Sequence, residues 1–292
     1  MTPFTYEELY TRFIAWASEQ EAIRAAILIG SRARKHPPAD EFSDADILII
    51  THRPEQILHT TDWLDQIQPH WMTFLEQTAD GDGMERRVMF EPGLDVDFIP
   101  ETVERIKAFL EQPLVRSIIA RGHRILLDKD GLLDGLEVSE EDIKAGQDVA
   151  LPTAAEFHNF THDYWYHTVW AVKRMLRGEL WTAKQSIDSG LKWPIVRAME
   201  WHAKATHGPD YDTWYKGRFL DKWADPRFYE QLQNAYAYFN EEDLFKALTA
   251  TMNLFRTVTS ELADLLDLPY PTVADQQATR LVQELHNRLP QR

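Results

Sequence analysis

Cysteine is absent from this sequence of 292 residues. That absence excludes disulfide bonds, zinc–thiolate sites and a cysteine nucleophile. No stretch approaches the roughly 20 consecutive apolar residues that a membrane-spanning helix needs. The first residues also lack the basic start and apolar segment of a signal peptide. We therefore expect a cytoplasmic protein that has no membrane partner.

Basic residues are also scarce. Lys and Arg total 31 against 47 Asp and Glu, which gives a formal net charge of -16. Such a charge repels a phosphate backbone, so we expect no nucleic-acid partner, whereas a cationic small molecule would be attracted. The same charge could serve solubility alone, so it limits the partners without identifying one. Neither a P-loop nor a GxGxxG motif is present, which leaves a kinase or dehydrogenase without support.

The first part of the chain carries both helix and strand signals. Thr5 and Glu8 have the spacing of a capping box, and apolar residues then recur at helical intervals. The apolar runs 25–29 and 46–51 are typical of buried strands. Residues 86–100 have the pattern of two strands joined by a turn.

Strand signals are absent after about residue 150, and an acidic, Gly-containing stretch near residues 131–152 is the expected place of a domain boundary. Helical patterns follow, and the one over residues 180–205 contains Gly190, which indicates a kink or break. We predict an α+β fold in which a mixed-sheet domain over residues 1–140 precedes an all-helical bundle over residues 141–292.

A Gly-Ser-Arg tripeptide follows the first predicted strand. Gly30 permits a tight turn and a close approach of the backbone to a ligand. Ser31 and Arg32 offer a hydroxyl and a guanidinium, both suited to phosphate oxygens. Most such tripeptides are ordinary turns, so this one needs support from its surroundings.

Two aspartates begin the next predicted strand. Asp44 and Asp46 are two residues apart, so in a strand both side chains point to the same side. Two unpaired carboxylates there would repel each other, and a magnesium ion, which prefers hard oxygen ligands, would relieve the repulsion. A solvated Asp-rich turn is the alternative.

A later strand carries a second alternating pair, Asp95 and Asp97. If this strand lies beside the first, three carboxylates can bind two metal ions about 3.5–4 Å apart, an arrangement suited to in-line attack on a phosphate. The alternative is a hairpin with one face in water.

These motifs occur in an order that resembles the polymerase-β-like nucleotidyltransferase superfamily. In that superfamily a strand, a Gly-Ser turn, a spaced Asp pair and a later carboxylate follow one another. Further segments, among them GSRAR, DEFSDADI, DVDFIP, RGHRILLDKDGLL and HDYWYHTVWAVKRMLRGELWTAK, are together similar to the aminoglycoside 6-adenylyltransferase (streptomycin adenylyltransferase) family. The resemblance runs from residue 5 to about residue 270. It implies a polymerase-β-like N-terminal domain that uses ATP as co-substrate and Mg²⁺ as cofactor.

The resemblance assigns a role to each motif of the first domain. Gly30, Ser31 and Arg32 would bind the ATP phosphates, and Asp44 and Asp46 would hold magnesium.

The third carboxylate of the family lies five residues before the proline of a strand-ending Ile-Pro, which is Asp95 in this chain. Asp95 would serve as general base and as a further metal ligand. Asp97 lies on the same face of the predicted strand as Asp95, so it is the alternative candidate for the catalytic carboxylate.

The second domain departs from the family pattern. The family has Asn-Glu-Phe-Trp-Trp early in its first long C-terminal helix, where this chain has HDYWY. In the family this domain covers the active site and helps to bind the antibiotic. Asp163 and Trp165 are candidate substrate contacts, the first as a partner of a substrate ammonium group and the second as a ring lining a sugar-binding cleft. Lys173 and Lys184 lie on predicted helices and are candidates to close over the triphosphate. Packing of Trp165 in the core, a local ion pair at Asp163 and ordinary surface lysines are the alternatives.

The resemblance therefore predicts Mg²⁺-dependent transfer of AMP from ATP to a hydroxyl of an aminoglycoside such as streptomycin, with release of pyrophosphate. A nucleotidyltransferase that acts on another small molecule or on a protein is one alternative. A nucleotide-binding regulatory module without activity is the other, although such a module would have no physical need for clustered carboxylates.

Overall fold

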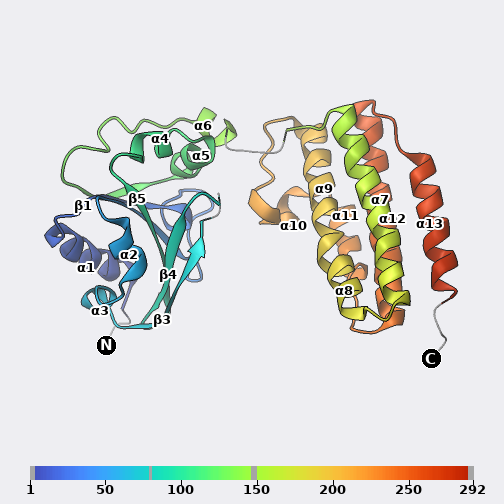
Figure 1. The fold of residues 1–292 in the computed structure, drawn as a ribbon. Helices are drawn as coiled ribbons and strands as arrows, with labels where there is room; N and C mark the ends of the chain where they lie inside the picture. The colour runs from blue at the N-terminus through green and yellow to red at the C-terminus, as the bar shows by residue number, and fades with distance from the viewer. Residues whose placement is uncertain (1–3, 79–80, 146–149, 289–292) are drawn as a thin grey trace. The chain divides into compact units, whose positions relative to one another are not determined.

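The structure is a computed structural model, and it describes residues 4–78, 81–145 and 150–288 (Figure 1). The chain divides into two compact units, Met1–Asp148 and Val149–Arg292. No helix in the described ranges is both long enough and apolar enough to cross a membrane.

The division falls later than the predicted boundary at residue 140 because of one short helix. Residues Glu140–Ala145 form α6, which packs against α5 (Pro113–Arg121). The Arg116 Nε atom donates to Asp142 Oδ1 at 2.7 Å and joins the two helices. The acidic helix α6, with Glu140, Glu141 and Asp142 in its first turn, therefore belongs to the first unit.

A six-stranded mixed sheet forms the centre of the first unit. In spatial order its strands are β3 (His70–Gln77), β4 (Met84–Phe90), β5 (Leu94–Thr102), β2 (Ala45–Thr51), β1 (Ile23–Ile29) and β6 (Arg124–Asp128). Among the described strands β2 and β5 pair in parallel, and the other neighbouring pairs are antiparallel. The predicted mixed sheet is confirmed.

Helices cover both faces of this sheet (Figure 1). On one face lie α1 (Tyr6–Glu19), α2 (Pro54–His59) and α3 (Leu64–Ile67), and on the other lie α4 (Ile106–Leu110) and α5. Alternate residues of β2 divide between these faces, so Ile47 and Ile49 pack under α1 while Leu48 and Ile50 pack under α4 and α5. Asp46 belongs by alternation to the second face, at the point where its apolar core ends.

The second unit is entirely helical in its described residues, as predicted. Its helices are α7 (Ala154–Leu176), α8 (Leu180–Gln185), α9 (Lys192–His207), α10 (Leu220–Trp223), α11 (Pro226–Gln231), α12 (Glu241–Leu266) and α13 (Thr272–His286). A π-helical turn over Ser186–Gly190 separates α8 from α9, so the break expected at Gly190 is present. The core is rich in aromatic rings, and Tyr164 stacks on Phe255 with ring centroids 3.4 Å apart.

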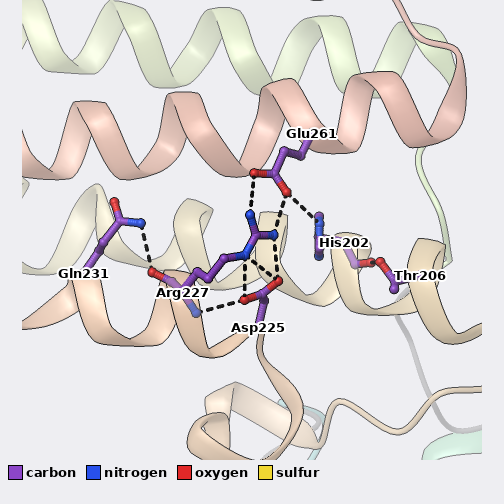
Figure 2. Close-up of polar contacts among 6 residues, drawn as sticks. All are labelled: His202, Thr206, Asp225, Arg227, Gln231 and Glu261. Carbon is purple, nitrogen blue, oxygen red and sulfur yellow. Dashed lines mark hydrogen bonds and ion pairs between the residues drawn. The ribbon is translucent and has the colours of Figure 1, made fainter.

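One polar network joins three of these helices (Figure 2). Asp225 caps α11 by accepting from the Arg227 backbone N–H at 2.8 Å, and it also pairs with the Arg227 guanidinium. That guanidinium donates to both carboxylate oxygens of Glu261 on α12, and Glu261 Oε2 lies 3.5 Å from His202 Nε2 on α9. The network fixes the short helix α11 against its two longer neighbours.

Candidate functional site

The turn after β1 is shaped by the aspartates of the adjacent strand. Gly30 has φ +69°, and a Cβ atom at this position would collide with Asp46 Oδ2. Ser31 is buried, and its hydroxyl donates to the Asp44 backbone carbonyl at 2.9 Å and lies 3.2 Å from Asp44 Oδ1. The Gly-Ser turn therefore lies directly against both carboxylates.

Three carboxylates meet at this turn. Asp44, Asp46 and Asp97 each offer an oxygen, and these oxygens all lie within 4.8 Å of one another. The parallel register of β2 and β5 explains the meeting, because it places Asp46 beside Asp97.

The electrostatics of the cluster point to a cation. Burial, together with the negative charges of Asp44 and Asp97, raises the pKa of Asp46 to about 8. Burial also raises the pKa of Asp97 to about 6, against the lowering effect of Arg87. Three hard oxygen ligands that repel one another fit a divalent cation such as Mg²⁺, whose charge would favour the ionised forms.

The third carboxylate of the cluster is Asp97, whereas the sequence favoured Asp95 as the metal ligand. Asp95 precedes Asp97 by one step on the same face of β5 and is not part of the group of three. Its side chain is partly exposed, and burial raises its pKa. Its backbone N–H donates to the Tyr6 hydroxyl at 3.0 Å, so α1 holds the start of β5 in place. The geometry favours Asp97 over Asp95 as the third ligand and leaves Asp95 as the more accessible carboxylate.

Strand β4 adds charged side chains that the sequence interpretation missed. Arg87 lies opposite Asp97 and donates to its Oδ1 at 2.8 Å and to Glu76 Oε2 at 2.9 Å. Glu85, two residues earlier, shares this face, and burial together with the charge of Asp97 raises its pKa to about 7. A signal was available, because the hairpin predicted over residues 86–100 puts Arg87 across from Asp97 once its register is counted.

Arg32 has a structural role that the sequence did not indicate. Its guanidinium lies 3.3 Å from the centre of the Tyr6 ring, and its Nε donates to the Ser43 carbonyl at 2.8 Å. A further bond joins it to the Asp40 carbonyl at 3.3 Å. Arg32 thus holds the loop that leads into Asp44, and a phosphate contact would compete with these bonds.

The residues predicted in the second unit do not form a cluster of their own. Trp165 is only 2% exposed and packs in the aromatic core, which favours the alternative of core packing over a substrate contact. Lys184 pairs with Asp188 and donates to the Ala237 carbonyl at 2.6 Å, so its ammonium is already engaged. Lys173 and Asp163 are exposed, and an oxygen of Asp163 lies 3.3 Å from His167 Nδ1.

Comparison with known proteins finds similarity along most of the chain. A family model described as Streptomycin adenylyltransferase matches residues 5–285. The aminoglycoside 6-adenylyltransferase of Bacillus subtilis (strain 168) is 24% identical over 273 residues, covering 91% of this chain and 92% of the relative. The enzyme of the same name from Campylobacter jejuni is 24% identical over 275 residues, covering 91% and 90%.

Among solved structures, an aminoglycoside 6-adenyltransferase from Bacillus subtilis covers 96% of this chain and 97% of its own, with a TM-score of 0.45 and 19% identity. A CCA-adding enzyme in complex with CTP matches with a TM-score of 0.33 and 12% identity.

Proposed function

The chain belongs to the streptomycin adenylyltransferase family, and from that premise we propose that it transfers AMP from ATP to a hydroxyl group of an aminoglycoside, with release of pyrophosphate. One observation carries the proposal to these residues. Asp44, Asp46 and Asp97 bring carboxylate oxygens within 4.8 Å of one another beneath the Gly30–Ser31 turn. Clustered carboxylates repel one another and add nothing to a hydrophobic core, whereas the metal ions that assist nucleotidyl transfer are held by such a cluster.

In this proposal Asp44, Asp46 and Asp97 hold the metal ion, Mg²⁺. Bound there, it would neutralise the negative charge of the triphosphate and of the carboxylates. Gly30, Ser31 and Arg32 lie beside the carboxylates and are the proposed phosphate contacts.

The proton of the acceptor hydroxyl would pass to Asp95. The hydroxyl oxygen attacks the α-phosphorus, the new P–O bond forms, and the bond to the β-phosphate oxygen breaks as pyrophosphate leaves. Asp95 suits the part of base because it is more exposed than Asp97, and burial raises its pKa, which makes it a better proton acceptor. Asp97, whose Oδ1 already accepts from Arg87, is less free to take this proton.

The acceptor would be cationic. The net charge of -16 and the surplus of carboxylates on the β2–β5 face attract such a molecule, and they disfavour a polyanion. Asp163 remains a proposed acceptor contact and Lys173 a proposed phosphate contact, since both side chains are exposed.

A transfer assay with ATP labelled at the α-phosphate, Mg²⁺ and a panel of aminoglycosides that includes streptomycin tests the proposal. We expect one labelled aminoglycoside product per pyrophosphate released, and Asp46→Asn should abolish both. Asp130→Asn is the matched control, because Asp130 pairs with Arg24 near the opposite end of β1. Turnover only with a different acceptor would show that the acceptor is not an aminoglycoside. ATP binding without pyrophosphate release would indicate a nucleotide-binding regulatory module that has no transfer activity.

A further inference from the structure

Arg87 joins three strands at the edge of the carboxylate cluster. It lies on β4, between β3 and β5, and its guanidinium is held from both sides. The Nε atom donates to Asp97 Oδ1 at 2.8 Å, and a terminal nitrogen donates to Glu76 Oε2 at 2.9 Å. The next residue back, Arg86, faces the other side and donates to the Ile57 carbonyl at 2.9 Å. Only one of these two adjacent arginines is therefore directed at the site.

The effect on Asp97 is specific. The side chain of Asp97 is 5% exposed, and one of its two oxygens accepts the Arg87 bond. Among the described residues, none donates a hydrogen bond to its second oxygen. A carboxylate can rotate and bind a cation through either oxygen or both. An arginine fork fixed by a second carboxylate removes that freedom and leaves one oxygen for the cluster.

We propose that Arg87, anchored by Glu76, is a positioning residue that holds Asp97 as a one-oxygen ligand of the metal site. The inference rests on the proposed function, because it takes Asp44, Asp46 and Asp97 as the metal ligands. It assigns to Arg87 an orienting role and not a supply of charge, and these two roles predict different results. Removing a positive charge beside three carboxylates strengthens their attraction for a cation. Removing an orienting contact misplaces the ligand, and a misplacement of about 1 Å can lower a rate by about 10².

The experiment compares metal affinity with turnover in the full-length chain. Binding of Mn²⁺ is measured without nucleotide, from the electron paramagnetic resonance signal of free Mn²⁺, and kcat for AMP transfer is measured with Mg²⁺. We expect Arg87→Gln to lower kcat by about 10² while Mn²⁺ binds at least as tightly as to the wild type. We expect Arg87→Lys to remain at least about tenfold below wild type, because lysine restores the charge without the planar fork.

Two further variants complete the set. Glu76→Gln leaves Arg87 in place but weakens its outer anchor, so we expect kcat to fall only about two- to fivefold. Arg24→Gln removes a comparable two-bond pair with Asp130, far along β1 from the cluster, and should leave kcat within about twofold of the wild type. Thermal unfolding of each variant shows whether it is folded, and Glu76→Gln keeps the inference testable if the Arg87 variants are not.

Three results would overturn the inference: wild-type kcat in Arg87→Gln, a loss of Mn²⁺ affinity equal to the loss of kcat, or full recovery by Arg87→Lys. A wild-type chain that binds no Mn²⁺ and transfers no AMP would instead refute the proposed function, and this inference with it.

Discussion

Replacement of Gly30 by alanine separates the shape of the turn from the chemistry beneath it. Gly30 has φ +69°, a conformation that costs a residue with a side chain about 1–2 kcal/mol. The added methyl group would also occupy the place of Asp46 Oδ2, so the carboxylate must move. The first effect destabilises the fold, whereas the second disables the metal site.

A matched variant isolates the second effect. Gly135 belongs to the same unit and has φ +78°, but a Cβ atom there would meet no heavy atom within 4 Å. Gly135→Ala therefore carries the same backbone penalty without displacing any group. Each kcal/mol should lower the Tm by about 2–4 °C in a domain of this size.

The assays are thermal unfolding, Mn²⁺ binding and AMP transfer. We expect both variants to lose a similar few degrees, while only Gly30→Ala loses about 10² in kcat, because a metal ligand has shifted by about 1 Å. Equal kcat values in the two variants would refute the reasoning, since they would show that Asp46 can move without consequence.

Three further predictions follow from the same structure. Asp97→Asn should weaken Mn²⁺ binding at least tenfold, whereas Asp95→Asn should lower kcat by about 10²–10⁴ with Mn²⁺ affinity kept; the reverse pattern would exchange the two roles. Trp165→Phe should lower the free energy of unfolding by about 2 kcal/mol in denaturant titration and leave the KM for the acceptor unchanged, because the ring lies in the core; a raised KM would restore it as a substrate contact. Burial lowers the pKa of Lys192 from its ordinary 10.5 to about 8, so between these values the unfolded chain binds more protons and stability rises with pH. Lys192→Met should flatten that rise, and an unchanged slope would assign it to other groups.

Local patterns were enough to predict much of the first unit. The capping box of Thr5 and Glu8 is present at the start of α1. Asp46, Asp95 and Asp97 lie on strands as expected, and Asp44 lies one residue before β2 begins. These features depend on neighbours in the sequence, and the sequence displays them directly.

The choice between Asp95 and Asp97 depends on a different kind of information. Which of them meets Asp46 is set by the register between β2 and β5, whose paired residues are separated by about fifty positions in the chain. Alternation shows that both share a face but cannot show which is opposite Asp46, because a slip of two residues keeps the face and changes the partner. Arg87 could have been found, since a hairpin register follows from its turn. The choice between core packing and substrate contact for Trp165 could not be made from the sequence. A helical stripe of aromatic rings does not reveal which of them a neighbouring helix covers.

The carboxylate cluster has an energetic cost that explains why it lies where it does. Asp46 continues the row of Leu48 and Ile50 along β2, so extending that row with another apolar residue would enlarge the core. Instead the row ends in a carboxylate whose pKa is raised to about 8, chiefly by burial and then by the repulsion of Asp44 and Asp97. Without a bound cation, its ionisation in neutral solution opposes folding, since the unfolded chain gives up that proton more easily. A bound cation would offset the destabilising effect of this carboxylate, so metal binding would itself stabilise the folded protein. Mg²⁺ should therefore raise the Tm of the wild type and leave that of Asp46→Asn nearly unchanged.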